Sequence, residues 1–217
     1  MTTVAVMQPY FVPYAGYFRL FAAADLFVVY DCVQFPRRGW VHRNRLPTAD
    51  GRPDWLTLPV AKAPRAARIA DMALAGDAAA ALATRMCRFP ALAGGAGHPV
   101  LEAVQAASGG LTDYLERGLG AVCAALGLPF RTRRSSSLAI DPALRGQDRI
   151  LAILDRLGAR AYVNAPGGRD LYDAADFARR GIALRFLDPY AGADCSILQR
   201  LMTEDPAALT AEIRRQA

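Results

Sequence analysis

Residues 4–20 read VAVMQPYFVPYAGYFRL, and this stretch predicts a buried strand, a shaped loop and a helix in direct succession. The apolar residues 4–7 suit a parallel strand that is covered on both faces. Pro9 and Pro13 fix φ and remove backbone donors, so the chain between them continues neither as a strand nor as a helix. Apolar residues at helical spacing then predict an amphipathic helix over residues 17–24, whose free N–H groups at its start face the loop.

The loop carries groups that favour ligand binding. Gln8, Tyr10 and Tyr14 add polar atoms that a purely hydrophobic cap over the sheet edge does not need. Gly16 allows another backbone or a ligand to approach closely. We therefore expect this loop to present a ligand, with a hydrophobic cap as the alternative.

Length and composition indicate a folded protein with a substantial core. The 217 residues suffice for one generous domain or two small ones. Hydrophobic residues make up 53% and charged residues 21% of the chain, which argues against disorder. Apolar runs such as residues 26–30 are too short to span a membrane, and the N-terminus lacks the pattern of a signal peptide. We expect a cytoplasmic protein without membrane insertion.

The cysteines and histidines point away from metal and disulfide chemistry. Cys32, Cys87, Cys123 and Cys195 are far apart and form no CxxC motif, so neither a zinc site nor a disulfide framework is indicated. Two histidines are too few for a histidine-rich metal site. We expect free thiols and no metal, and the sequence leaves any organic cofactor unassigned.

Arginine supplies almost all of the positive charge. The formal net charge is +6, the sequence pI is about 9.5, and Lys62 is the one lysine. The arginines cluster in residues 36–45 (PRRGWVHRNR) and 131–137 (RTRRSSS). Each cluster creates a local positive field that favours an anionic ligand, either a phosphorylated small molecule or a nucleic-acid backbone. Solvated surface arginines are the alternative.

Strand and helix patterns alternate at both ends of the chain. The order of strand, helix and second buried strand (residues 26–30) at the start predicts a parallel sheet. Residues 41–46 and 54–60 are two extended runs joined by a turn that contains Asp50-Gly51, which is typical of a hairpin. The remaining predictions are a short strand at 69–74, helices at 78–89, 99–107 and 111–126, strands at 130–132, 161–164 and 184–187, and helices at 146–157 and 173–179.

Together these patterns predict a single α/β domain over residues 1–217. We expect a mostly parallel sheet that takes strands from both chain ends, with a β-hairpin excursion and a helical insertion at about residues 76–128. A two-domain arrangement is the alternative.

The densest polar segment runs from Asp31 to Arg45. Asp31 directly follows a predicted buried strand, where parallel sheets bind ligands, and is placed to act as a base, a metal ligand or a partner of an arginine. Alternation along an extended run puts Trp40, His42 and Asn44 on one face, in a row suited to stack on and hydrogen-bond a ring or a sugar. A structural role for His42 is the alternative. No GxGxxG, GxxxxGK[ST] or GxSxG motif occurs.

Two later segments carry weaker signals. Gly167 and Gly168 follow a predicted strand and can turn backbone N–H groups toward an anion, with Arg169 adding charge. An ordinary turn is the alternative there. Cys195 and Ser196 place a thiol beside a hydroxyl, and a helix cap is a simpler role for this pair than nucleophilic catalysis.

A set of N-terminal residues forms a recognisable pattern: Met7-Gln8-Pro9-Tyr10-Phe11, Pro13, Gly16-Tyr17-Phe18, Asp25, Asp31, Val33-Gln34, Arg38-Gly39-Trp40 and Asn44-Arg45. Weaker C-terminal features agree with it: Arg149-Ile150, Leu157-Gly158-Ala159, Tyr162, Gly167-Gly168, Tyr172, Phe177, Gly181-Ile182 and Ser196-Ile197. With these residues the chain resembles the WbqC-like protein family over nearly its whole length. Cys32 and Gln199 stand where family members often carry acidic residues, which weakens any metal mechanism built on paired carboxylates.

The resemblance implies a pathway rather than a reaction. WbqC-like proteins are associated with gene clusters for O-antigen and other surface polysaccharides, and with natural-product clusters. The predicted strand, loop and helix also resemble the HxGH-type turn of nucleotidyltransferases and class I aminoacyl-tRNA synthetases, with Gln8 and Tyr17 where histidines stand. That turn holds phosphates at a helix start, but adenylyl transfer by its mechanism is impaired without the histidines.

From these signals we expect a biosynthetic group-transfer enzyme, with acyl or aminoacyl transfer to an amino sugar or another small amine as the favoured reaction. The donor is a small molecule with a phosphate or nucleotide, or an RNA-linked molecule. The expected roles are a general base at Asp31 or His42, anion binding by Arg38, Arg45 and Arg169, orientation by Gln8 and Asn44, and apolar walls from Tyr10 and Trp40. The alternatives are a non-catalytic module that binds a nucleotide sugar or RNA, and a scaffold in a polysaccharide assembly complex. The oligomeric state stays unassigned.

Overall fold

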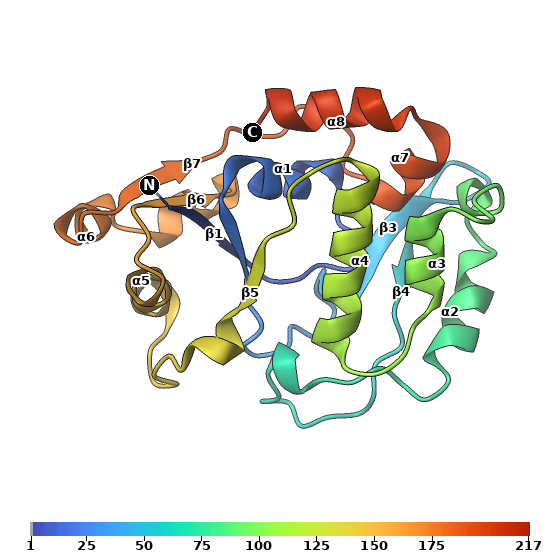
Figure 1. Ribbon diagram of the computed structural model, residues 1–217. Helices are drawn as coiled ribbons and strands as arrows, with labels where there is room; N and C mark the ends of the chain where they lie inside the picture. The colour runs from blue at the N-terminus through green and yellow to red at the C-terminus, as the bar shows by residue number, and fades with distance from the viewer. Residues whose placement is uncertain (1) are drawn as a thin grey trace.

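A parallel sheet takes its strands from both ends of the chain (Figure 1). In the computed structural model, which describes residues 2–217, this sheet has five strands in the order β5-β2-β1-β6-β7. All neighbouring strands pair in parallel, so the expected α/β fold class is confirmed. The strands are β1 (Thr3–Met7), β2 (Leu26–Val29), β5 (Thr132–Arg134), β6 (Ala161–Asn164) and β7 (Ala183–Phe186).

The central strands are buried on both faces because alternate residues point into two separate cores. Val4 and Val6 of β1 pack in one core, with helices α5 (Gly146–Arg156) and α6 (Ala174–Arg179). Ala5 packs in the other core, with α1 (Ala15–Ala23) and α8 (Pro206–Arg215). The continuous apolar run at residues 4–7 therefore satisfies both faces of a covered parallel strand.

The predicted hairpin is confirmed as a separate two-stranded sheet. Strands β3 (Arg43–Pro47) and β4 (Pro53–Thr57) pair antiparallel, with Gly51 in the connecting turn at φ 78°. In Figure 1 the hairpin lies on the side of the molecule away from α5 and α6, next to the helices of the middle of the chain. Those helices are α2 (Ala78–Met86), α3 (Pro99–Gln105) and α4 (Leu111–Ala125), and α7 (Ile197–Thr203) completes this side.

The strand expected at residues 69–74 is wrong. Residues Ile69–Asp71 form a 3-10 turn, η1, and isolated bridges follow it. A bidentate pair, with Arg68 Nε and Nη2 at 2.7 and 2.8 Å from the Asp71 carboxylate, closes the turn. The backbone N–H groups of Ile69 and Ala70 donate to carbonyls of the loop just after β2. The segment is therefore bonded to this loop and is not part of a sheet.

Two buried arginines fasten the C-terminal part of the chain. The Arg19 guanidinium, on α1, donates to the carbonyls of Gly16, Asp188 and Gln216 at 2.9 to 3.2 Å. Arg200, on α7, donates to the carboxylates of Glu204 and Glu212 at 2.7 to 2.9 Å. Two carboxylates thus neutralise Arg200, and backbone carbonyls accept from Nε and Nη1 of Arg19. Among residues 2–217, no helix is long and apolar enough to cross a membrane.

The Arg200 cluster predicts a component of acid sensitivity. Hydrogen bonds from Arg200, followed by one from Tyr190, lower the pKa of Glu212 from 4.5 to about 2. A carboxyl with a depressed pKa in the folded state adds stability above its unfolded pKa and loses it as the pH falls through the folded pKa. We expect the free energy of urea unfolding to fall between pH 4.5 and pH 2, and Glu212→Gln to lack this part of the fall.

The matched control is Glu102→Gln, which changes an exposed glutamate on α3 for which the described residues show no ion pair. This control should keep the wild-type pH dependence. An unfolding profile for Glu212→Gln that runs parallel to the wild type over the whole range would contradict the role of the pair.

Candidate functional site

A cavity of about 490 Å³ opens at the carboxyl ends of β1 and β6. The chain leaves β1 toward β2 on one side and leaves β6 toward β7 on the other, so the strand order reverses between these two strands. Parallel α/β sheets bind their ligands in the crevice at such a switch point. The cavity therefore lies at the position where the sheet topology predicts a ligand site.

Two loops form most of the cavity wall. The loop after β1 and the start of α1 supply one side, and the 3-10 turn η4 (Pro166–Leu171) after β6 supplies the other. Seven of the residues expected to bind substrate line this space together: Gln8, Tyr10, Tyr14, Gly16, Tyr17, Gly167 and Gly168. Because tyrosines dominate the wall, we call this space the tyrosine cavity.

A strained residue shapes the first of these loops. Val12 has φ 38°, an unfavourable value for a β-branched residue, at a cost of roughly 1–3 kcal/mol. Its carbonyl accepts hydrogen bonds from Asn44 Nδ2 at 2.7 Å and Ser196 Oγ at 2.6 Å. Asn44 Nδ2 also donates to the Phe11 carbonyl at 3.1 Å. Asn44, expected to orient a substrate, thus lies behind the loop and holds it in place.

The glycines of the wall make room for the protein's own side chains. A Cβ atom at Gly16 would overlap the ring of Tyr14, and one at Gly168 would lie 2.7 Å from Asn164 Nδ2. A Cβ atom at Gly167 would meet nothing within 4 Å. Close packing against Tyr14 and Asn164 therefore explains two of the three glycines without a ligand.

The tyrosine cavity offers neutral polar groups between aromatic walls. Burial raises the pKa of Tyr10, and burial likewise raises the pKa of Tyr30 to about 12, so both hydroxyls stay protonated at neutral pH. Asn164 Nδ2 lies 3.4 Å from the Tyr172 hydroxyl. Leu171, at the cavity wall, is 67% exposed. The described lining contains no carboxylate, imidazole or thiol.

A second cavity of about 670 Å³ lies at the carboxyl ends of β2 and β5, and Arg68, Arg145 and Arg149 line it. We call it the arginine cavity. The buried Asp31 lies directly behind its wall, where its carboxylate accepts hydrogen bonds from Ser135 Oγ at 3.0 Å and from Ser136 Oγ at 2.7 Å. Asp31 therefore reaches the cavity through the Ser136 hydroxyl.

Of the remaining expected residues, Asn44 and Arg45 lie on β3 of the hairpin, and Trp40 lies in the turn before it. Trp40 packs against Trp55 with ring centroids 5.2 Å apart, and the Arg43 guanidinium lies 4.0 Å over the Trp55 ring. Arg45 joins this group at 5.6 Å from the Trp40 ring. The expected row of Trp40, His42 and Asn44 on one face is wrong, because β3 begins only at Arg43 and Trp40 lies in the preceding turn.

His42 and the three other cationic candidates also line neither cavity. The His42 ring packs 5.0 Å from Phe35, and burial, aided by the charge of Arg43, lowers its pKa to about 4, so it is neutral at pH 7. Arg38 is exposed, with φ 63°. Arg45 pairs with Asp194 at 3.4 Å, and Arg169 lies 3.7 Å from Asp188.

Sequence reasoning missed the groups that depend on burial. The tyrosine cavity is also lined by Asn164, Tyr172 and Tyr30, and the arginine cavity is lined by Arg149 and Ser136. A signal existed for Arg149, because it is a charged residue directly before the apolar Ile150 and Leu151, which both lie on the buried face of α5. Asn164 similarly ends a buried strand.

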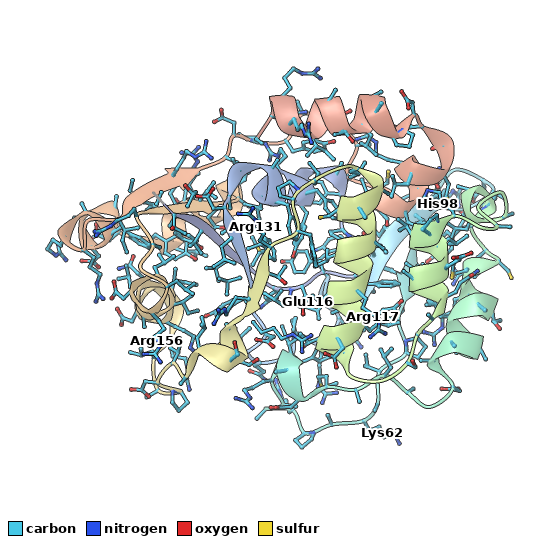
Figure 2. All side chains as sticks on the ribbon, viewed as in Figure 1. Lys62, His98, Glu116, Arg117, Arg131 and Arg156 are labelled. Atoms are coloured by element: carbon cyan, nitrogen blue, oxygen red, sulfur yellow. The ribbon has the colours of Figure 1, made fainter. Side chains whose placement is uncertain are left out.

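The described residues show no metal-binding group and a structural role for Ser196. Among residues 2–217, no three histidine, cysteine or acidic side chains gather as metal ligands. His98, labelled in Figure 2, caps α3 because its Nδ1 accepts from Val100 N at 3.2 Å. Ser196 caps α7 through Leu198 N at 3.3 Å, and burial raises the pKa of the neighbouring Cys195 thiol.

Comparison with known proteins gives a family and a relative of unknown function. The model of the WbqC-like protein family matches residues 8–192. "Uncharacterized protein Rv1507c" of Mycobacterium tuberculosis is 29% identical over 198 residues, which cover 87% of this chain and 83% of that protein. No solved structure matches the chain significantly.

The hydrogen bonds from Asn44 to the first loop predict which Asn44 variant loses more stability. Asn44→Asp replaces an amide donor with a carboxylate that faces two carbonyl oxygens, so we expect a loss of about 3–5 kcal/mol in the free energy of unfolding. Asn44→Ala removes the donor without adding a charge, and we expect about 1–3 kcal/mol. Urea unfolding at pH 7 measures both. An Asn44→Ala variant as stable as the wild type would show that the amide does not hold the loop.

Proposed function

The chain belongs to the WbqC-like protein family, and from this premise we propose that it is a biosynthetic group-transfer enzyme whose substrate binds in the tyrosine cavity. The observation that carries the proposal is the position of that cavity at the switch point between β1 and β6, with tyrosine and amide groups on its walls. The family's association with surface-polysaccharide and natural-product gene clusters supports a biosynthetic role.

The walls favour a substrate that contains a ring. Tyr10 and Tyr17 pack with centroids 5.5 Å apart on one side, and Tyr172 lies on the other. Aromatic faces stack on the flat or apolar side of a sugar or a heterocycle, while Gln8 and Asn164 can satisfy its polar edge. An amino sugar or the base of a nucleotide fits this combination.

Acyl or aminoacyl transfer to an amine is the reaction that we favour. The amine nitrogen attacks the carbonyl carbon of the donor, a C–N bond forms, and the bond from that carbon to the leaving group breaks. The amine proton passes to Ser136 Oγ, whose own proton moves across 2.7 Å to the Asp31 carboxylate. In this scheme Asp31 is the general base, and Ser136 connects it to the arginine cavity.

A second candidate function rests on the hairpin. Trp40 and Trp55, with Arg43 and Arg45 over their rings, form a partly exposed cluster of aromatic and cationic groups. Such clusters bind single-stranded nucleic acid by stacking and by phosphate contacts. A non-catalytic RNA-binding module is therefore the alternative.

The first experiment identifies the ligand and its location. The protein is purified and denatured, and small molecules that co-purify are identified by mass spectrometry. We expect a ring-containing compound with the wild type, and its loss from Gly167→Leu, which adds a side chain at the cavity wall where there is open space. Tyr10→Ala, which removes a wall, should lose it too.

Gly76→Leu is the matched control, because a Cβ at Gly76 also meets nothing within 4 Å but lies outside both cavities. Retention of the compound by both Gly167→Leu and Tyr10→Ala would contradict the proposed location. RNA that co-purifies and is released steeply with salt would favour the hairpin module instead.

The second experiment tests the base. Asp31→Asn keeps the shape of the side chain and should preserve the melting temperature, but it should abolish transfer from the co-purified donor to glucosamine, because the amide does not accept the proton. Asp25→Asn changes a carboxyl at the opposite end of β2, where it accepts from Thr3 N at 2.8 Å. It should leave turnover unchanged. Full turnover by Asp31→Asn would remove Asp31 from the mechanism.

A further inference from the structure

Arg149 is a buried cation that lines the arginine cavity. It lies on the first turn of α5 and is 7% exposed. Its Nη2 donates to the Pro142 carbonyl at 3.0 Å. The Tyr30 hydroxyl also lies beside the guanidinium, which opposes the rise in the pKa of that tyrosine.

The other two buried arginines show what Arg149 lacks. Arg19 donates to three backbone carbonyls, and Arg200 is paired with two glutamates. No carboxylate among residues 2–217 lies within ion-pair distance of Arg149. Arg19 also lacks a carboxylate, but three carbonyls accept from its guanidinium, whereas among the described residues Pro142 supplies the one carbonyl bonded to Arg149. Burial of a charge with so few partners is costly, so Arg149 points to an anion from outside the chain.

Arg149 keeps N–H donors for which the described residues show no acceptor. A guanidinium has five N–H donors, and the described contacts use few of them. No nitrogen of Arg149 is both unpaired and fully buried, so its free N–H groups reach the open space. The two other arginines that line the cavity, Arg68 and Arg145, are exposed.

The lining of the arginine cavity has a positive balance. None of the described residues that line it is acidic. The Arg145 guanidinium donates to the Pro142 and Leu144 carbonyls and so stabilises the loop beside Arg149. The bidentate pair with Asp71 offsets the charge of Arg68. Arg149 and Arg145 are therefore the cations available to an anion.

We propose that the arginine cavity binds a phosphate or pyrophosphate group of the substrate, with Arg149 as its principal donor. A planar guanidinium matches two oxygens of a phosphate at once. Ile150, the next residue on α5, lines the tyrosine cavity, and so does Tyr30. A substrate with its ring in the tyrosine cavity can thus extend past Tyr30 to Arg149. This inference rests on the proposed function only for the position of the ring.

The test uses inorganic pyrophosphate as the probe, because it has no ring and does not depend on the tyrosine cavity. Isothermal titration calorimetry at constant ionic strength should show binding to the wild type. Arg149→Met should weaken it about tenfold or more, and Arg149→Lys should retain part of the affinity because it keeps the charge. Arg156→Met, on the same helix and labelled in Figure 2, changes an exposed arginine and should bind like the wild type.

A thermal melt separates loss of binding from loss of fold. Because Arg149→Met removes an uncompensated buried charge, it should melt at or above the wild-type temperature in the absence of pyrophosphate. Gly167→Leu should bind pyrophosphate normally even where the ring ligand is lost.

The outcomes decide between the two proposals. Absence of pyrophosphate binding to the wild type, or equal affinity in the wild type and Arg149→Met, would overturn the phosphate site and leave the ring site standing. If Arg149→Met does not fold, the comparison uses Arg149→Lys and Arg156→Met. Pyrophosphate affinity that is unchanged in Arg149→Lys but lost in Arg156→Met would then overturn the phosphate site. Pyrophosphate binding that depends on Arg149, without any ring ligand, would support this inference and count against the proposed function.

Discussion

The carbonyl oxygen of Val12 is the point on which the site depends. Asn44 from the hairpin and Ser196 from the start of α7 both donate to it, and together they hold Val12 in a backbone conformation that it would not adopt alone. With that residue fixed, the loop turns its tyrosines over the end of the sheet. The wall of the tyrosine cavity is therefore set by two side chains that never touch the cavity.

The sheet explains why two cavities lie next to each other. Its strands alternate their side chains between two cores, so the faces are closed and the carboxyl ends are the part left open to solutes. Tyr30, which lines the tyrosine cavity, lies beside Arg149, which lines the arginine cavity. The substrate that we propose, with a ring at one end and a negative charge at the other, would contact both compartments.

Local sequence patterns predicted the features that depend on neighbouring residues. The apolar run of β1, the helical spacing after it and the turn at Gly51 were sufficient for the fold class, and the residues of the first loop do line a cavity. The sequence does not reveal long-range hydrogen bonds, so Asn44 reads as a ligand group when it is a tether. It also does not reveal which arginines find a carboxylate, which is why Arg149 stood out only once its surroundings were known. The strand expected at residues 69–74 is a 3-10 turn instead, because its backbone N–H groups bond to the loop after β2 and not to a neighbouring strand.

The reach of the Ser196 hydrogen bond to Val12 has a consequence for synthesis on the ribosome. The two residues are 184 positions apart, and the Arg19 contact to Gln216 spans 197. Every strand of the sheet is translated before Ser196, so a nascent chain can assemble its framework early while the first loop still waits for its last anchor. A truncated product that ends after β7 would contain all the strands and all the residues of the tyrosine cavity, yet its first loop would lack the hydrogen bond from Ser196.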